Sequence, residues 1–99
     1  MARFKLTNKA VEDLNRIWAY TFEQWSEAQA DTYYYQLLDC CKRLSKNPEI
    51  GKAYDRITPF LYGFRLNKHV VFYRTTGEND IEIIRILHER MDLENRLRE

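Results

Sequence analysis

Basic and histidine side chains recur through the last third of the sequence, at positions where they could act on a phosphodiester. They are Arg65, His69, Arg74, Arg85, His88 and Arg90. Phosphodiester hydrolysis without a metal needs a general base, a general acid and cations directed at the transition-state phosphate. His88 is the best single acid-base candidate, because an unperturbed imidazole titrates near neutrality. These residue types would permit nuclease chemistry.

The same residues have a structural interpretation. Strand arginines commonly pair with carboxylates on a neighbouring strand, and Glu82 could serve Arg85 in this way. A histidine at a strand end often caps backbone groups, and Asp92 would suit the free N–H groups of a following helix. The sequence contains no glycine-rich phosphate loop, nucleophile elbow or paired-carboxylate signature. The residues alone therefore favour structural roles.

Hydrophobic periodicity predicts a short strand and two helices in the first half. "RFKL" (3–6) alternates polar and apolar residues, and Thr7 is a candidate N-cap. The first helix runs from Lys9 to about Trp25, with an apolar stripe of Val11, Leu14, Trp18, Phe22 and Trp25. Ser26 and Gln29 have capping-box spacing, which predicts a second helix from Glu27. Its stripe is Ala30, Tyr34, Leu37, Cys41 and Leu44, and "KNPEIG" ends it.

Three strand-like runs follow: "FLYGFRL" (60–66), "HVVFYRT" (69–75) and "IEIIRIL" (81–87). Their separators, "NK" and "TGEND", suit hairpin turns. We therefore predict an α+β fold in the order βααβββ. In this prediction an antiparallel sheet packs on one helical hairpin, and "ERMDLENRL" could add a short C-terminal helix. We expect residues 1–99 to form a single domain.

The pattern predicts more apolar surface than one hairpin can cover. Ile81, Ile83 and Leu87 should face one side of the sheet, with Ile84 and Ile86 on the other. Tyr20 and Tyr35 fall far from the helical stripes. One interpretation is that these residues belong to an ordinary amphipathic surface. The other interpretation is that this surface contacts a binding partner. The candidate partner-binding residues are Ile17, Tyr20, Tyr33, Tyr35, Leu38, Ile84 and Ile86.

Composition excludes several other classes. A net charge of +1 argues against direct nucleic-acid binding through phosphate contacts. Cys40 and Cys41 are adjacent on a predicted helix, where neighbouring side chains point about 100° apart and cannot easily form a disulfide. We therefore interpret them as reduced residues of the core. No metal-ligand spacing joins them to His69 or His88. We expect no cofactor, no membrane association and, without a signal-peptide segment, a cytoplasmic location.

The stretches "AVEDLNRIWAY", "LSKNPEIG", "HVVFYR" and "ILHERMD" occur in the order and spacing of ParE-type toxins. The sequence resembles this branch of the RelE/ParE toxin-antitoxin superfamily across essentially its whole length. The resemblance implies a toxin that poisons DNA gyrase by binding, without catalysis. It also implies neutralisation by a ParD-like antitoxin with a ribbon-helix-helix DNA-binding part. The candidate target-binding residues are His88, Arg90, Met91 and Asp92.

Two alternatives stay open. A RelE-like, ribosome-dependent mRNA endonuclease would use Arg65, Arg85, His88 and Arg90. Val70 and Asn95 depart from the sheet arginine and C-terminal tyrosine that such nucleases carry, which counts against cleavage. The second alternative is a non-toxic module that binds a DNA-binding antitoxin.

Overall fold

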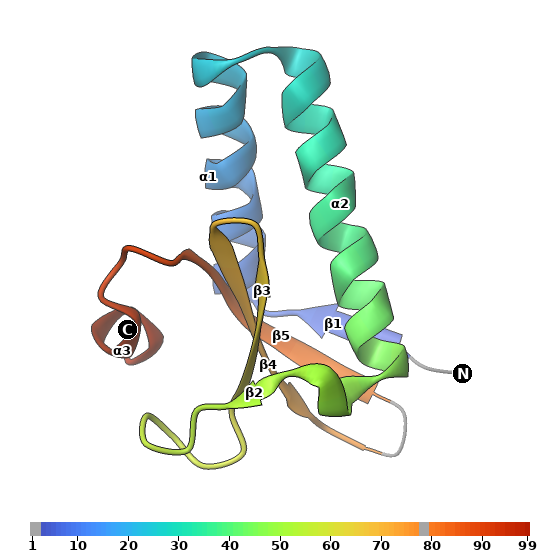
Figure 1. Ribbon diagram of the computed structural model, residues 1–99, viewed down its shortest axis with the longest axis vertical. Helices are drawn as coiled ribbons and strands as arrows, with labels where there is room; N and C mark the ends of the chain where they lie inside the picture. Colours follow the sequence, from blue (N-terminus) through green and yellow to red (C-terminus); the bar gives the residue numbers. More distant parts are fainter. Residues whose placement is uncertain (1–2, 78–79) are drawn as a thin grey trace.

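Two long helices stand side by side on a five-stranded sheet (Figure 1). The computed structural model describes residues 3–77 and 80–99. Helix α1 spans Asn8–Gln24 and α2 spans Glu27–Lys46, followed by the short 3-10 helix η1 (Pro48–Ile50). A last helix, α3, spans Leu93–Leu97. The α+β class, the order of the predicted elements and the C-terminal helix are confirmed.

The sheet has the strand order β1-β5-β4-β3-β2. Strands β3 (Tyr62–Leu66), β4 (His69–Thr75) and β5 (Asp80–His88) form the predicted antiparallel meander. Strand β1 (Arg3–Leu6) pairs with β5 in parallel, which makes the sheet mixed. Strand β2 (Lys52–Ala53) was not predicted, because two residues are too short to carry a periodic signal. The predicted turn "TGEND" includes residues 78–79, which lie outside the described residues.

Side-chain caps fix where both long helices begin, as the sequence predicts. The Thr7 hydroxyl accepts a hydrogen bond from the Ala10 N–H at 3.0 Å. The Ser26 hydroxyl accepts one from the Gln29 N–H at 3.1 Å. Each cap satisfies a backbone donor that the first helical turn leaves free. Because only Trp25 and Ser26 join the helices, the hairpin is tight.

The packed face of α1 differs from the predicted stripe. Its buried residues are Ala10, Asp13 and Leu14. Val11, Phe22 and Trp25 of the predicted stripe are 41%, 46% and 72% exposed. The upper part of the hairpin rises beyond the sheet, so its aromatic residues have no strand layer beneath them (Figure 1). Nearer the sheet, α1 turns Asp13 toward β5, which periodicity of apolar residues does not register.

Helix α2 follows its prediction more closely. Ala30, Leu37, Cys41 and Leu44 are buried. Cys40 is buried too, and both cysteines are free thiols, as expected of core residues. Burial raises the pKa of Cys41 to about 12, so its thiol is unreactive near neutrality.

Strand β5 contains a bulge in the middle of the sheet. On β4, Phe72 and Tyr73 are neighbours, but their partners on β5 are Arg85 and Ile83. Ile84 is therefore an extra residue with no partner on β4. Such an insertion reverses the alternation of faces beyond it.

The bulge corrects the predicted faces of the sheet. Ile83 and Ile86 both lie in the main core under the hairpin, and Ile86 is only 2% exposed. Ile84 and Leu87 pack in a second cluster. The prediction that placed Leu87 with Ile83, and Ile86 on the opposite face, is wrong because the sequence pattern does not reveal the extra residue.

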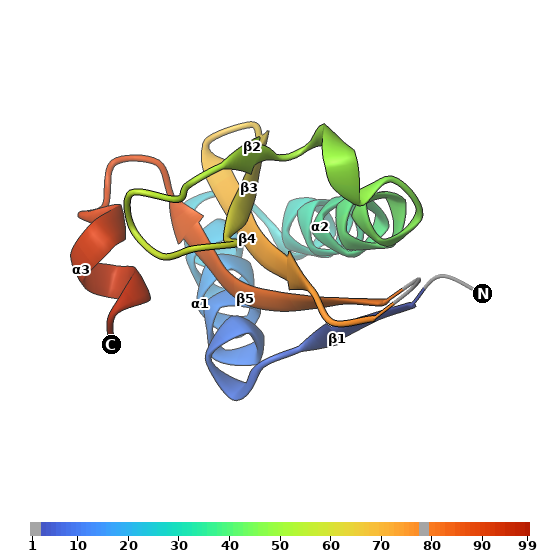
Figure 2. The same cartoon turned by 90° about the horizontal axis from the view of Figure 1, so that it is seen from below.

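Two segments cover the second cluster: helix α3, which follows the meander, and the loop that precedes β3. Its buried members are Leu61, Val70, Phe72 and Leu87. Leu93 and Leu97 of α3 pack against it, together with Tyr54 and Ile57 of the loop before β3. Figure 2 shows α3 beside the sheet, separate from the two long helices. This face is therefore shielded and does not remain as bare apolar surface.

No helix within the described ranges is long and apolar enough to cross a membrane.

Candidate functional site

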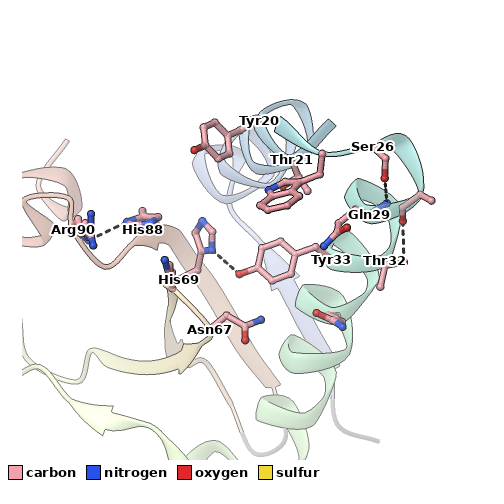
Figure 3. Close-up of a pocket in the computed structure, with 14 residues that line it drawn as sticks. Tyr20, Thr21, Ser26, Gln29, Thr32, Tyr33, Asn67, His69, His88 and Arg90 are labelled. Carbon is pink, nitrogen blue, oxygen red and sulfur yellow. Dashed lines mark hydrogen bonds between the residues drawn. The ribbon is translucent and has the colours of Figure 1, made fainter. Parts of the chain in front are cut away.

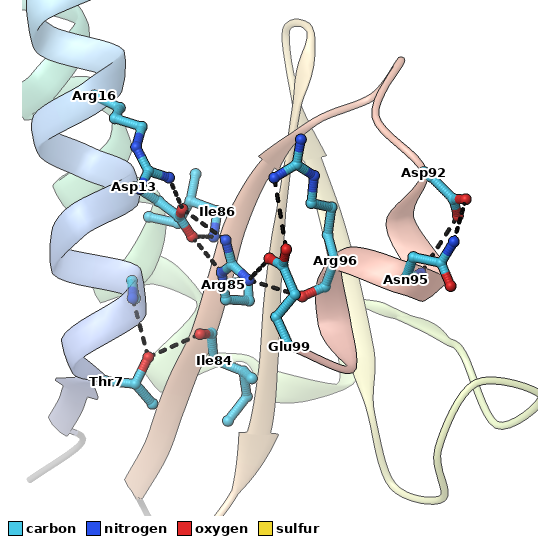
Figure 4. A network of polar contacts seen from close by, with 11 residues as sticks. Thr7, Asp13, Arg16, Ile84, Arg85, Ile86, Asp92, Asn95, Arg96 and Glu99 are labelled. Carbon is cyan, nitrogen blue, oxygen red and sulfur yellow. Dashed lines mark hydrogen bonds and ion pairs between the residues drawn. The ribbon is translucent and has the colours of Figure 1, made fainter.

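The polar residues of the last strand fall into two groups, and the first is a closed ion-pair network (Figure 4). Arg85 donates from Nε to Asp13 Oδ2 at 2.7 Å and from Nη2 to Asp13 Oδ1 at 3.0 Å. Arg85 is 5% and Asp13 4% exposed. Asp13 Oδ2 also accepts the backbone N–H of Ile86 at 3.0 Å. Because β1 pairs only with residues 80–83 of β5, this N–H lies on a strand edge that Asp13 completes.

The same guanidinium also binds residues in and after helix α3. Nη1 of Arg85 donates to the Arg96 carbonyl at 2.8 Å and to Glu99 Oε1 at 3.2 Å. The hydrogen bond with Asp13 is the main cause that raises the pKa of Arg85, against the opposing effect of burial. With its donors engaged inside the protein, Arg85 holds α1, β5 and α3 together. Its predicted ion-paired role is confirmed, although the partner is Asp13 and not Glu82.

Arg65, the other strand arginine of the nuclease alternative, is also engaged. Its Nη2 lies 2.6 Å from Glu89 Oε2, and its Nε donates to the Asn67 carbonyl at 3.0 Å. Arg65 and Arg85 are therefore both held by carboxylates of the protein, Glu89 and Asp13. Within residues 3–77 and 80–99, no three His, Cys, Asp or Glu residues come together as a metal-binding group.

The second group opens into a groove of about 990 Å³ between the tip of the hairpin and one end of the sheet (Figure 3). We call it the tip groove. Its hairpin wall includes Tyr20, Trp25, Gln29 and Tyr33. Trp25, in the joint between the helices, is 72% exposed, and Tyr20 is 65% exposed. Because this part of the hairpin rises beyond the sheet, large aromatic faces are exposed to solvent (Figure 1).

The sheet wall of the tip groove comes from two strand ends. Lys68 belongs to the β3–β4 turn, where Asn67 has a φ of 54°. Asparagine tolerates this left-handed conformation better than most residues, which permits the tight turn. His69 opens β4 and faces His88, its cross-strand partner at the end of β5. Arg90 follows directly after β5.

A tyrosine-histidine-histidine cluster forms the floor between these walls (Figure 3). The Tyr33 hydroxyl and His69 Nδ1 are 2.6 Å apart. The rings of His69 and His88 meet edge to face, with centroids 5.3 Å apart. Burial, the main cause, and the neighbouring His88 together lower the pKa of His69 from 6.5 to about 4, against the opposing effect of Glu89. His69 is therefore neutral near pH 7, and burial also raises the pKa of Tyr33.

His88 has the backbone role that its strand-end position predicts. Its Nδ1 accepts the N–H of Arg90 at 3.1 Å. Asp92 caps α3, because its Oδ1 accepts the Asn95 N–H at 3.3 Å and its Oδ2 accepts the Asn95 side-chain amide at 2.7 Å. Both predicted capping roles are confirmed. Met91 is 42% exposed between them.

The candidate partner-binding residues occupy different parts of the fold. Tyr20 and Tyr33 line the tip groove, whereas Tyr35 lies in a separate hollow with Trp18 and Asp31. Ile17 and Leu38 are half-buried against the main core. Ile84 is half-buried in the second cluster and Ile86 is buried, so neither forms an exposed patch.

The sequence did not single out the pairing of His69 with His88, nor Lys68. The signal was available in principle, since the predicted strands 69–75 and 81–87 form a hairpin in which their outer ends must approach. The bulge makes residue-by-residue pairing uncertain from the sequence, and the register alone brings the two imidazoles together.

A helical hairpin on this mixed sheet, with an open polar groove at one end, defines a small α+β domain. The chain belongs to a known family: residues 4–93 match the family described as "ParE toxin of type II toxin-antitoxin system, parDE". It is thus a ParE-type toxin of a type II toxin-antitoxin system.

Characterised relatives agree with this assignment. The chain is 38% identical over 96 residues to Toxin ParE1 of Mycobacterium tuberculosis, covering 97% of this chain and 98% of that protein. It is 34% identical over 97 residues to Toxin ParE of Escherichia coli, covering 98% and 94%. A solved structure titled "Chromosomal ParDE TA system from P. aeruginosa" has the same fold, with a TM-score of 0.76 at 22% identity over 89% of this chain and 96% of that chain.

Proposed function

We propose that this chain poisons DNA gyrase by binding and that a cognate ParD-like antitoxin neutralises it. The match to ParE toxins over residues 4–93 is the observation that carries the proposal. A gyrase poison of this kind stabilises a state in which gyrase has cut DNA, and so needs a recognition surface and no bond-making residues of its own. The tip groove offers such a surface, with His88 and Arg90 as candidate target contacts beside the exposed Met91.

The engagement of two arginines supports binding over RNA cleavage. Arg85 is buried in its pair with Asp13, and Arg65 pairs with Glu89. A nuclease of the RelE type would need such cations at the scissile phosphate, where they stabilise developing charge. Freeing Arg85 would leave Asp13 buried without its partner, which is costly.

The test uses the purified chain with gyrase and relaxed plasmid. We expect supercoiling to fall and cleaved DNA to accumulate after protease treatment, and the antitoxin to reverse both effects. The variant Arg90→Ala/Met91→Ala should lose the effect on gyrase while keeping its folded circular-dichroism spectrum. Ribosome-dependent cuts in mRNA, with gyrase unaffected, would overturn the proposal.

A further inference from the structure

The helical hairpin is acidic from the middle of α1 to the later turns of α2. Residues 17–41 contain no lysine or arginine, and their four carboxylates give this stretch a net charge of −4 in a chain of net charge +1. All four side chains are exposed, and none forms an ion pair with another residue of the described ranges. These carboxylates are those of Glu23, Glu27, Asp31 and Asp39. The hairpin therefore carries negative charge that its own chain does not neutralise.

Three of these carboxylates follow one line along α2. Glu27, Asp31 and Asp39 occur at intervals of four or eight residues, so their side chains share one face of the helix, with Tyr35 between the last two. Like charges four residues apart destabilise a helix. A cationic group bound on this face would offset the repulsion, which favours a ligand of positive charge.

Asp31 belongs to a second cavity of about 470 Å³, lined from both helices, which we call the hairpin hollow. None of its lining residues lines the tip groove. Three aromatic rings, one amide and one carboxylate form its wall, and no lysine or arginine of the described residues contributes to it. The lining residues are Asn15, Trp18, Asp31, Tyr34 and Tyr35.

The rings and the carboxylate of the hairpin hollow are held in place before any ligand binds. Trp18 Nε1 donates to Asp31 Oδ1 at 2.9 Å, and the Trp18 ring stacks on Phe22 with centroids 5.3 Å apart. Tyr34 and Tyr35 meet edge to face, with centroids 5.7 Å apart. Since only Oδ1 of Asp31 is engaged by Trp18, Oδ2 is available to a ligand.

This combination suits a guanidinium group. A cation above an aromatic ring is attracted by the electrons of the ring face, and tryptophan is the strongest of the aromatic residues in this respect. A guanidinium is planar, so it can stack on a ring and donate hydrogen bonds to a carboxylate at the same time, whereas a lysine ammonium is compact and strongly hydrated. The hairpin hollow should therefore prefer arginine to lysine.

Charge complementarity identifies the partner that would supply this arginine. A protein that acts on DNA must present cations to the phosphates, so DNA gyrase has a basic surface where it holds DNA. A segment that neutralises a toxin is under no such requirement. A hairpin that carries four carboxylates and no lysine or arginine over residues 17–41 is complementary to the basic surface of gyrase.

We propose that the hairpin hollow binds an arginine side chain on the DNA-facing surface of gyrase. The guanidinium stacks on Trp18 or Tyr35 and donates to Asp31 Oδ2. This assignment rests on the proposed function, because it takes gyrase as the target, and it adds a contact surface separate from the tip groove.

The first test uses the gyrase supercoiling and DNA-cleavage assay with the variant Asp31→Asn. The amide oxygen can still accept the Trp18 hydrogen bond, so the substitution removes the charge and keeps the shape. The matched control is Asp39→Asn, the same substitution at an exposed position of α2 outside the hollow. We expect Asp31→Asn to raise the concentration for half-maximal inhibition about fivefold or more, and Asp39→Asn about twofold or less. Both variants should retain the antitoxin affinity of the unaltered chain.

The second test examines the hollow without gyrase. The ¹⁵N-labelled chain is titrated with N-acetyl-arginine amide and with N-acetyl-citrulline amide, its neutral analogue of the same shape. We expect the indole N–H resonance of Trp18, identified with the variant Trp25→Phe, to shift with the arginine compound and not with the citrulline compound. Asp31→Asn should reduce that shift.

The outcomes separate the two proposals. If the unaltered chain poisons gyrase but Asp31→Asn and Asp39→Asn are equally potent, the inference is overturned and the proposed function stands. Equal shifts with the arginine and citrulline compounds would also overturn it. Loss of antitoxin affinity in Asp31→Asn, with unchanged gyrase poisoning, would assign the hollow to the antitoxin and overturn the inference. A chain that leaves gyrase unaffected would overturn the proposed function and the inference with it.

Discussion

Arg85 and His88 lie on the same strand, yet one closes a buried network and the other faces an open groove. At Arg85, α1 lies against the free edge of β5, and Asp13 fills the position that another strand would occupy. At His88 the strand ends where the helices rise beyond the sheet (Figure 1). Residue type and spacing therefore do not determine the role of a polar strand residue. What decides it is whether a neighbouring element covers that part of the strand.

The largest expected effect comes from breaking the closed network. Asp13→Ala leaves the Arg85 guanidinium buried without its main partner and removes the acceptor of the Ile86 N–H. We expect it to lower the free energy of unfolding by about 3–5 kcal/mol, measured by urea denaturation. Asp39→Ala, at an exposed position of α2, is the control and should cost about 0.5 kcal/mol or less. A loss below about 1 kcal/mol for Asp13→Ala would contradict the assigned role.

A smaller effect should appear in the pH dependence of stability. His69 has its pKa lowered from the ordinary 6.5 to about 4 by burial, so the unfolded chain binds a proton there before the folded chain does. Its contribution is fully present above pH 6.5 and is lost as the pH falls toward 4. Allowing for partial exposure, we expect a loss of about 1–3 kcal/mol across this window.

The measurement compares unfolding free energies of the unaltered chain and His69→Gln from pH 7.5 to pH 4, so that carboxylates remote from His69 contribute alike to both profiles. The unaltered chain should lose more stability than the variant over this range. Parallel profiles would show that His69 is not desolvated as the groove geometry requires.

The smallest effect on stability should come from the exposed tyrosines, where binding is the informative readout. Tyr20 and Tyr35 are 65% and 64% exposed, so Tyr20→Ser and Tyr35→Ser should each change the unfolding free energy by about 0.5 kcal/mol or less. Antitoxin affinity then compares the two faces of the hairpin. A loss with Tyr20→Ser alone favours the tip groove, and a loss with Tyr35→Ser alone favours the other face. Unchanged affinity in both variants would remove both tyrosines from the interface.

The two regions also differ in how far the sequence could predict them. The capping roles of His88 and Asp92 depend on residues two or three positions away, so local pattern was sufficient. Arg85 was correctly read as ion-paired, but its partner lies 72 positions earlier in the chain. Rules based on neighbouring residues cannot predict a contact over that separation. The burial of Ile86 was missed because one unpaired residue in β5 shifts every later side chain to the other face.

By itself the sequence determined the helices, their caps, the meander and the family, since each depends on the spacing of residues close along the chain. Only the tertiary structure determined which polar groups are buried in ion pairs and which line the groove. Asp13 reaches Arg85 because α1 packs along β5, and His69 meets His88 through the β4–β5 register. Those contacts join residues far apart in sequence, and their burial, and hence their charge state, exists only once the elements have packed.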